Sequence, residues 1–135
     1  MPKPNFQTFD APLPKTLVSA MQPTNRAVVL TESEPPYRVW NVNCAWQKLC
    51  GYSLTEARHL TLGSLLLNSE VDSIKAIDLV EKILRGEQEV EATLVNYKKC
   101  GKRFVDHIRI GPIYNKHGKL THFVGVVEEV SQTNQ

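Results

Sequence analysis

Three cysteines and four histidines are the side chains of this sequence best suited to nucleophilic, redox or metal chemistry. Cys44, Cys50 and Cys100 form no Cys-x-x-Cys pair and show no zinc-ligand spacing. The histidines are dispersed, and no two of them stand at helical ligand spacing: His59, His107, His117 and His122. The pattern predicts idle thiols in a reducing compartment and no metal site. A haem would have to rely on a lone histidine.

Catalytic motifs are also missing from the sequence. No serine or cysteine lies in a recognisable nucleophile motif, and neither a G-x-G-x-x-G run nor a phosphate loop is present. We therefore expect no enzymatic activity. The basic run KKCGKR, residues 98–103, could be a phosphate patch, but charged residues of this kind are typical of a solvated hairpin tip.

Asp106 is the carboxylate that calls for an explanation. It alternates with Phe104 and Ile108 in a strand-like stretch, so we expect it to face the core. A carboxylate in such a place must be paired or neutral. One interpretation is a structural partner such as a lysine, a tyrosine or a backbone amide, and the other is a polar anchor for a small ligand.

Composition indicates one folded domain of ordinary character. The chain has 135 residues, of which 41% are hydrophobic and 22% charged, close to a globular average. The net charge of +2 is too small to favour direct nucleic-acid binding. No apolar run approaches the roughly 20 residues of a membrane span, and no signal-peptide core is present. We expect an intracellular protein with no membrane association.

Hydrophobic periodicity places strands near both ends of the sequence and helices in the middle. Residues 1–25 read as a proline-rich arm followed by a short amphipathic helix, in which Leu17, Val18 and Met21 share a face with Leu13. Five stretches have the composition of strands: 26–32, 37–43, 89–99, 102–115 and 120–130. Strands clustered around a helical middle predict an α+β domain with an antiparallel sheet. We place this domain at residues 26–131, with a tail at 132–135.

Capping residues locate the helices. Asn43 is a plausible N-cap with Gly51 as the stop, and Ser53 with Glu56 forms a capping box. Ser69 with Asp72 should open one long helix that ends at Gly86. The predicted apolar stripe of that helix consists of Val71, Ile74, Ile77, Leu79, Val80, Ile83 and Leu84.

Both faces of the predicted sheet carry apolar residues, so each face needs a cover. The helices cover one face, which holds Asn96, Asp106, Ile108 and Val127. The other face would be covered by the N-terminal segment of this chain or by that of a second subunit. An alternative is that the valines only reflect strand propensity in a monomer. The predicted contact residues are Leu13, Leu17, Val18, Met21, Val95, Val105, Val124 and Val126.

Three motifs together resemble a PAS domain: NVNCAWQKLCGYSLTEA, LVNYKKCGKRFVDHIRIGPI and GKLTHFVGVVEEVS. Within PAS domains they are similar to the light-oxygen-voltage (LOV) branch, over roughly residues 26–131. The resemblance implies a five-stranded antiparallel sheet in the order 2-1-5-4-3, with short helices and one longer helix on one face. It also implies a sensory or dimerising role, as a homodimer or a PAS-PAS heterodimer. The sequence further resembles PAS regions of algal basic helix-loop-helix or leucine-zipper factors, which would imply transcription regulation and a nuclear location.

The same resemblance implies that the flavin chemistry of LOV domains has been lost here. In that branch the stretch matching residues 60–72 supplies a photoactive cysteine, a phosphate-binding arginine and a glutamine, and this chain has Gly63, Ser64 and Leu67 instead. A shift of one residue would put Leu62 at the cysteine position. Asn96 is retained, but Asp106 and Val127 replace a second asparagine and a final-strand glutamine, with Ile108 on the same face. We therefore expect no cofactor and interpret LTLGSLLL as packing. The alternative is a sensor that holds a small apolar or flavin-type ligand without photochemistry.

Overall fold

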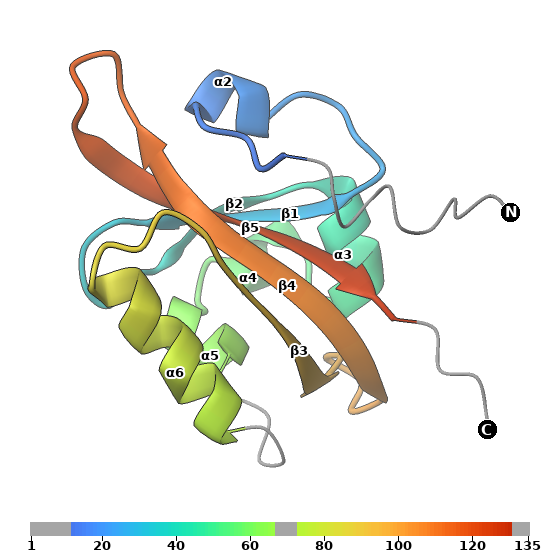
Figure 1. Cartoon of the computed structure of the whole chain (residues 1–135). Helices are drawn as coiled ribbons and strands as arrows, with labels where there is room; N and C mark the ends of the chain where they lie inside the picture. Colours follow the sequence, from blue (N-terminus) through green and yellow to red (C-terminus); the bar gives the residue numbers. More distant parts are fainter. Residues whose placement is uncertain (1–11, 67–72, 131–135) are drawn as a thin grey trace, which may run out of the picture.

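One antiparallel sheet organises the molecule (Figure 1). The computed structural model describes residues 12–66 and 73–130. The five strands lie in the order β2-β1-β5-β4-β3. Their bounds are β1 Ala27–Glu32, β2 Val39–Val42, β3 Val90–Tyr97, β4 Arg103–Tyr114 and β5 Leu120–Glu129. The predicted fold class and strand order are confirmed, and each strand ends within two residues of its predicted limits.

Helices cover both sides of this sheet, but one side carries much more helix than the other (Figure 1). The short helix α2, Leu17–Ala20, covers one side, which we call the outer face. The other side, the inner face, is covered by the four helices that follow along the chain. These are α3 Cys44–Cys50, α4 Leu54–Ala57, α5 Leu62–Leu66 and α6 Ser73–Leu84. Among the described residues no helix is both long and apolar enough to cross a bilayer.

The helix caps follow the sequence signals closely. Asn43 caps α3, and Gly51 ends it with a left-handed backbone at φ 89°. Ser53 and Glu56 form the expected capping box at α4. The predicted caps Ser69 and Asp72 of the long helix lie outside the described residues.

Part of the predicted apolar stripe of α6 is exposed to solvent and not buried. Ala76, Leu79 and Ile83 are buried against the sheet. In contrast, Ile74, Ile77 and Leu84 are 83%, 46% and 52% exposed. Aliphatic residues surround more of this helix than a single face can bury, so periodicity alone did not identify the inward side. Val71 lies outside the described residues.

The predicted face of the N-terminal helix is wrong for two of its four residues, since Leu13 and Leu17 pack in the outer core but Val18 and Met21 do not. Thr16 and Ser19 form a reciprocal capping box, so α2 begins at Leu17. That start turns Ala20 toward the sheet beside Leu13, and both are buried. Val18 and Met21 point to solvent, with 74% and 51% of their surfaces exposed.

The sheet separates two apolar cores, because successive side chains alternate between its faces. The inner core packs strand residues against α3–α6. Its largest buried members include Trp46, Leu62, Leu66, Leu79, Leu94, Ile108 and Phe123. A smaller outer core lies beneath α2 and consists of Leu13, Ala20, Val28, Leu30, Ile113, Val124 and Val126. The predicted assignment of strand residues to two faces is confirmed.

Candidate functional site

The candidate site is the inner face of the sheet where α5 packs on it. Leu62 and Leu66 are almost fully buried there. The local fold follows from Thr61 and Ser64, which cap the helix reciprocally. Ser64 N–H donates to Thr61 Oγ1 (3.2 Å), and Thr61 N–H donates to Ser64 Oγ (2.7 Å). Ser64, at the predicted phosphate-binding position, therefore serves as a helix cap.

The described residues form one small cavity between α5 and the strands. The described residues enclose a cavity of about 10 Å³ there, roughly the room of one water molecule. Its walls are Val29, Thr31, Leu62, Leu65, Leu66, Ile108, Ile110, Phe123, Val124 and Gly125. Gly125 is packed so closely that a Cβ there would lie 3.1 Å from Val29 Cγ1. Leu62 and Leu66 of LTLGSLLL are thus buried in the inner core, and Leu60 and Leu65 pack against it.

Asn96 holds α5 against β3. Its Nδ2 donates to the Leu65 carbonyl (3.1 Å), and its Oδ1 accepts from the Tyr97 N–H (2.9 Å). Both ends of the amide are therefore used within the chain. Sequence reasoning identified Asn96 as an inward polar residue but could not reveal this partner, because Leu65 lies 31 residues away.

Asp106 and Cys50 lie near one another on the inner side. Asp106 is buried on β4, opposite Leu94 of β3 and Glu129 of β5. Burial raises the pKa of the Cys50 thiol to about 12, and the charge of Asp106 adds to the shift, while Lys98 opposes it. Cys50 is thus held as a neutral thiol, which is a poor nucleophile.

Thiol labelling tests this view of the cysteines. Cys44 and Cys100 are exposed, so both should be alkylated by iodoacetamide within minutes at pH 8. Cys50 should be labelled only when the chain is unfolded, because its thiolate is scarce and partly covered. Peptide mass spectrometry, with a denatured sample as control, measures each site. Equal native rates for Cys50 and Cys44 would contradict the assignment.

The remaining predicted pocket residues are distributed as follows. Ile108 and Val127 are buried in the inner core, and Gly63 is half-buried on α5. Leu67 lies outside the described residues. On the outer face, Leu13, Val124 and Val126 are buried within the chain itself, whereas Val95 and Val105 are half-buried. The predicted contact with a second subunit stays a prediction.

The basic turn at residues 98–103 is tied to the rest of the domain. Lys98 pairs with Glu129 at 3.6 Å, and Lys99 pairs with Glu56 of α4. Lys98 also lies over the Phe104 ring, 5.2 Å from its centroid. These contacts support the interpretation of the turn as a solvated hairpin tip.

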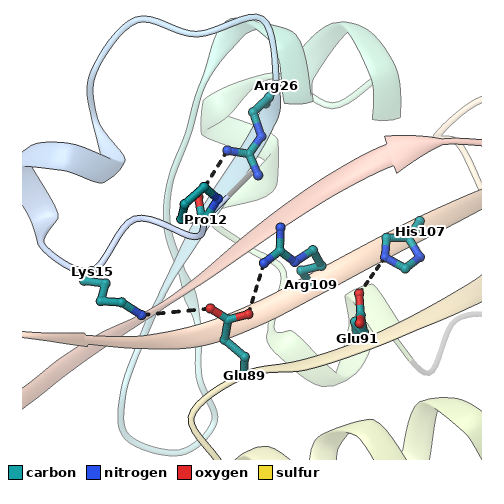
Figure 2. A network of polar contacts seen from close by, with 7 residues as sticks. All are labelled: Pro12, Lys15, Arg26, Glu89, Glu91, His107 and Arg109. Atoms are coloured by element: carbon teal, nitrogen blue, oxygen red, sulfur yellow. Dashed lines mark hydrogen bonds and ion pairs between the residues drawn. The ribbon is translucent and has the colours of Figure 1, made fainter. Parts of the chain in front are cut away.

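Figure 2 shows a polar network on the outer face that sequence reasoning missed. Glu89 accepts from Arg109 (3.1 Å) and lies 3.9 Å from Lys15, so it joins β4 to the N-terminal segment. His107 contacts Glu91 at 2.9 Å. The available signal was the pairing of opposite charges across neighbouring strands, since Glu91 lies opposite Arg109 in the register.

A family model described as "PAS domain" matches residues 25–132, which is most of the chain. The chain belongs to the PAS family. This PAS domain is 29% identical over 92 residues to a protein named blue-light-activated histidine kinase 2 from Erythrobacter litoralis. That match covers 68% of the chain and 26% of the relative. A blue-light-activated histidine kinase from Rhizobium johnstonii is 25% identical over 126 residues, 93% of this chain and 36% of the relative.

Solved structures agree with this assignment. The LOV domain of the Erythrobacter litoralis EL346 blue-light activated histidine kinase is 25% identical, with a TM-score of 0.71. The match covers 82% of this PAS domain and all of that chain. Another similar structure comes from work on a flavin analogue and the light-oxygen-voltage domain mechanism. It is 27% identical, with a TM-score of 0.69, and the match covers 79% of this chain and 78% of that one. The LOV-like resemblance is therefore supported.

The curated relatives are much longer than this chain, which limits how far their functions apply to it. The chain spans about a quarter to a third of the two curated relatives, both of which are named as kinases. The PAS domain itself is a sensor module and not a catalytic one. Functions of the longer relatives apply to this chain only as proposals.

Proposed function

We propose that this PAS domain is a regulatory and dimerisation module of a signalling or transcription-factor protein, working without flavin and without cysteine photochemistry. The observation that carries the proposal is the packing of α5, which leaves about 10 Å³ beside the described part of the inner face. No cysteine occurs in residues 60–72, and the three cysteines lie at positions 44, 50 and 100.

The polar residues of the inner face do not fit a flavin edge. The side-chain amide of Asn96 is already hydrogen-bonded to the backbone of Leu65 and Tyr97. The side chain of Val127 has no hydrogen-bonding group. Asp106, when ionised, would present a negative charge to carbonyl oxygens. Each missing polar contact to a buried ligand costs about 1–3 kcal/mol, so several together remove orders of magnitude in affinity. We therefore assign no chemical step to a flavin in this chain.

An absorbance spectrum tests the proposal directly. The chain should be purified after expression with excess riboflavin, beside a light-oxygen-voltage domain treated in the same way. We expect the control protein to be yellow and this PAS domain to show no flavin absorption in the blue. Stoichiometric flavin bound to this chain would contradict the proposal, with or without a light-induced change.

A ligand-binding sensor is the second candidate function. It is favoured by the composition of the residual cavity, whose walls are almost entirely aliphatic and aromatic. Such a sensor would hold a small apolar or flavin-type ligand without a cysteinyl photocycle. Mass spectrometry of an organic extract of the native protein distinguishes the two candidates, because only the sensor releases a defined small molecule.

The dimerisation part of the proposal rests on apolar residues of the outer face that are exposed or half-buried. Val18 and Met21 lie on the solvent side of α2, and Val95 with Val105 is half-buried beyond it. Exposed aliphatic residues above an apolar face are typical of a contact surface. A second copy of this chain, or a related PAS domain, is the partner that we propose, through an isologous contact.

Charge substitutions on α2 test the contact. Replacing Val18→Glu and Met21→Glu together should weaken self-association at least tenfold, roughly 1.4 kcal/mol, because both charges would be buried at the contact. Light scattering after size-exclusion chromatography gives the mass over a concentration series. Ile74→Glu, at a residue that is also largely exposed but lies on α6 at the opposite side of the sheet, is the control. An association constant unchanged by the double substitution would rule out this surface.

A further inference from the structure

A hollow lies between the C-terminal end of α6, the segment that joins β1 to β2, and the turn end of the β4-β5 hairpin (Figure 1). Its volume is about 180 Å³, and the ten residues that line it all belong to the described part of the chain. Three of them are the aromatic residues Tyr37, Tyr114 and Phe123, and a fourth is the acidic Glu87. We call these four residues and the space beside them the aromatic hollow.

The aromatic side chains run from the floor of the hollow to its rim. The rings of Tyr37 and Phe123 meet edge to face, with centroids 6.1 Å apart and planes inclined by 66°. Phe123 is 7% exposed, whereas Tyr37 is half-buried and Tyr114 is 37% exposed. The face of an aromatic ring carries the negative end of its quadrupole, so these walls favour a positively charged occupant.

The backbone of Tyr37 is held in an unusual conformation. Its φ is 59°, in the left-handed region that a bulky side chain rarely adopts. The Tyr37 N–H donates to the Glu34 carbonyl (2.7 Å), and the Tyr37 carbonyl accepts from the Leu62 N–H (2.9 Å). Backbone outliers persist where the surroundings fix them, and they are concentrated at functional sites. This conformation is a second observation in favour of a ligand site, independent of the ring chemistry.

Glu87 gives the aromatic hollow a negative charge. Among the ten described residues that line the hollow, it is the only one charged at neutral pH. Its Oε2 accepts from Arg85 Nη2 at 3.3 Å, but the side chains of Arg85 and Glu87 are 58% and 45% exposed. An ion pair this accessible to water is weak, so the carboxylate can attract a second cation.

The lining suits a quaternary ammonium better than a primary one. A primary ammonium is strongly hydrated and brings three N–H donors that need acceptors. The Ser33 hydroxyl already donates to the Leu120 carbonyl (3.5 Å). The Tyr114 hydroxyl already accepts from Gln88 Nε2 (3.4 Å). A quaternary ammonium has no N–H group, so ring faces and one carboxylate satisfy it.

The size of the hollow limits the ligand further. Its volume lies below the roughly 300 Å³ at which sites for drug-sized ligands begin, so it has room for a head group and little more.

We propose that the aromatic hollow binds the quaternary ammonium head of a small solute over the ring faces of Tyr37, Tyr114 and Phe123. The Glu87 carboxylate supplies the opposite charge. The hollow shares Phe123 with the small cavity beside α5, but it uses no residue of α2 and none of the proposed dimer contacts. Binding there is therefore independent of the proposed function, and either can fail alone.

Choline and its neutral isostere 3,3-dimethylbutan-1-ol separate a cation site from a merely apolar one. Titration of the full chain with labelled leucine methyls should give saturable shifts at Leu84 and Leu120, which line the hollow, and none at Leu66 of α5. The isostere has the same shape but no charge, so it should bind roughly tenfold more weakly. Equal affinities would overturn the proposal. Absence of saturable shifts with choline in the tens of millimolar would overturn it too.

Two pairs of variants assign the roles of ring and carboxylate. Tyr114→Leu should weaken choline binding roughly three- to fivefold, whereas Tyr114→Phe, which keeps the ring, should preserve it. Glu87→Gln should weaken binding by about threefold. Glu81→Gln, the same change at an exposed position of α6 outside the hollow, should have no effect. Melting temperatures confirm that each variant is folded. If Tyr114→Leu and Glu87→Gln both leave the affinity unchanged, the site is wrongly assigned.

A peptide that contains trimethyllysine distinguishes a free solute from a modified protein. It should bind no more tightly than choline, because the hollow has room for the head group alone. Tighter binding by the peptide would overturn the assignment to a small solute.

Discussion

The substitution Asn43→Ala should lower the free energy of unfolding by about 3 kcal/mol. This is one of the two largest effects that we expect from a single substitution. Asn43 Oδ1 accepts from the N–H groups of Val28 (3.0 Å) and Trp46 (2.9 Å), and its Nδ2 donates to the Arg26 carbonyl (2.7 Å). One side chain therefore caps α3 and satisfies two backbone groups of the β1 segment. Alanine would leave all three partners without their hydrogen bonds.

Chemical denaturation measures this loss, and the melting temperature should fall by roughly 10 °C. Asn43→Asp should cost less, because it keeps the acceptor for Val28 and Trp46 and loses only the donor to Arg26. Asn41→Ala is the control on neighbouring β2, since Asn41 makes no side-chain hydrogen bond among the described residues. A loss below about 1 kcal/mol for Asn43→Ala would show that water replaces these bonds.

The dual role of Asn43 shows what sequence reasoning could and could not provide. An asparagine before an amphipathic stretch predicted the N-cap, because that rule depends only on local spacing. Its bonds to β1 depend on the chain returning 15 and 17 residues away, which no local rule describes. The same division applies to Asn96, whose inward direction was predicted and whose contact with Leu65 was not.

Faces were predicted well for strands and poorly for helices. A strand has two faces, so alternation correctly separated Ile108 and Val127 from Val124 and Val126. A helix can rotate continuously, and a surplus of aliphatic residues leaves its orientation undetermined. This explains why Ile74 and Val18 were placed on buried sides and are exposed.

From the sequence, the candidate site could be predicted only as a set of flavin-binding side chains that this chain lacks. Comparison of motifs indicated that Gly63 and Val127 lack the chemistry expected at a flavin site. How far the leucines fill the vacated volume depends on packing, which a sequence does not display. Leu62 and Leu66 are buried, and the cavity that the described residues form beside them has a volume of about 10 Å³.

Leu66→Ala should reopen that cavity, and it is the second large effect that we expect. Leu66 is 1% exposed in the inner core, so loss of its three outer carbon atoms should cost about 3 kcal/mol of unfolding free energy. The new space is lined by apolar side chains, which favour a dry cavity that accepts benzene or xenon. Saturating benzene should therefore raise the melting temperature of the variant and leave the parent chain unaffected.

Ile74→Ala provides the matched control, because it removes aliphatic carbons from an 83% exposed position on α6 and should cost less than about 0.5 kcal/mol. Benzene should have no effect on that control. If Leu66→Ala loses little stability and binds nothing, the walls must collapse into the space, and the inner core is softer than its packing indicates. A large loss accompanied by binding would show instead that hydrocarbon packing alone closes this part of the domain. Under that result, restoring polar groups for a flavin would fail until the leucines of α5 were also made smaller.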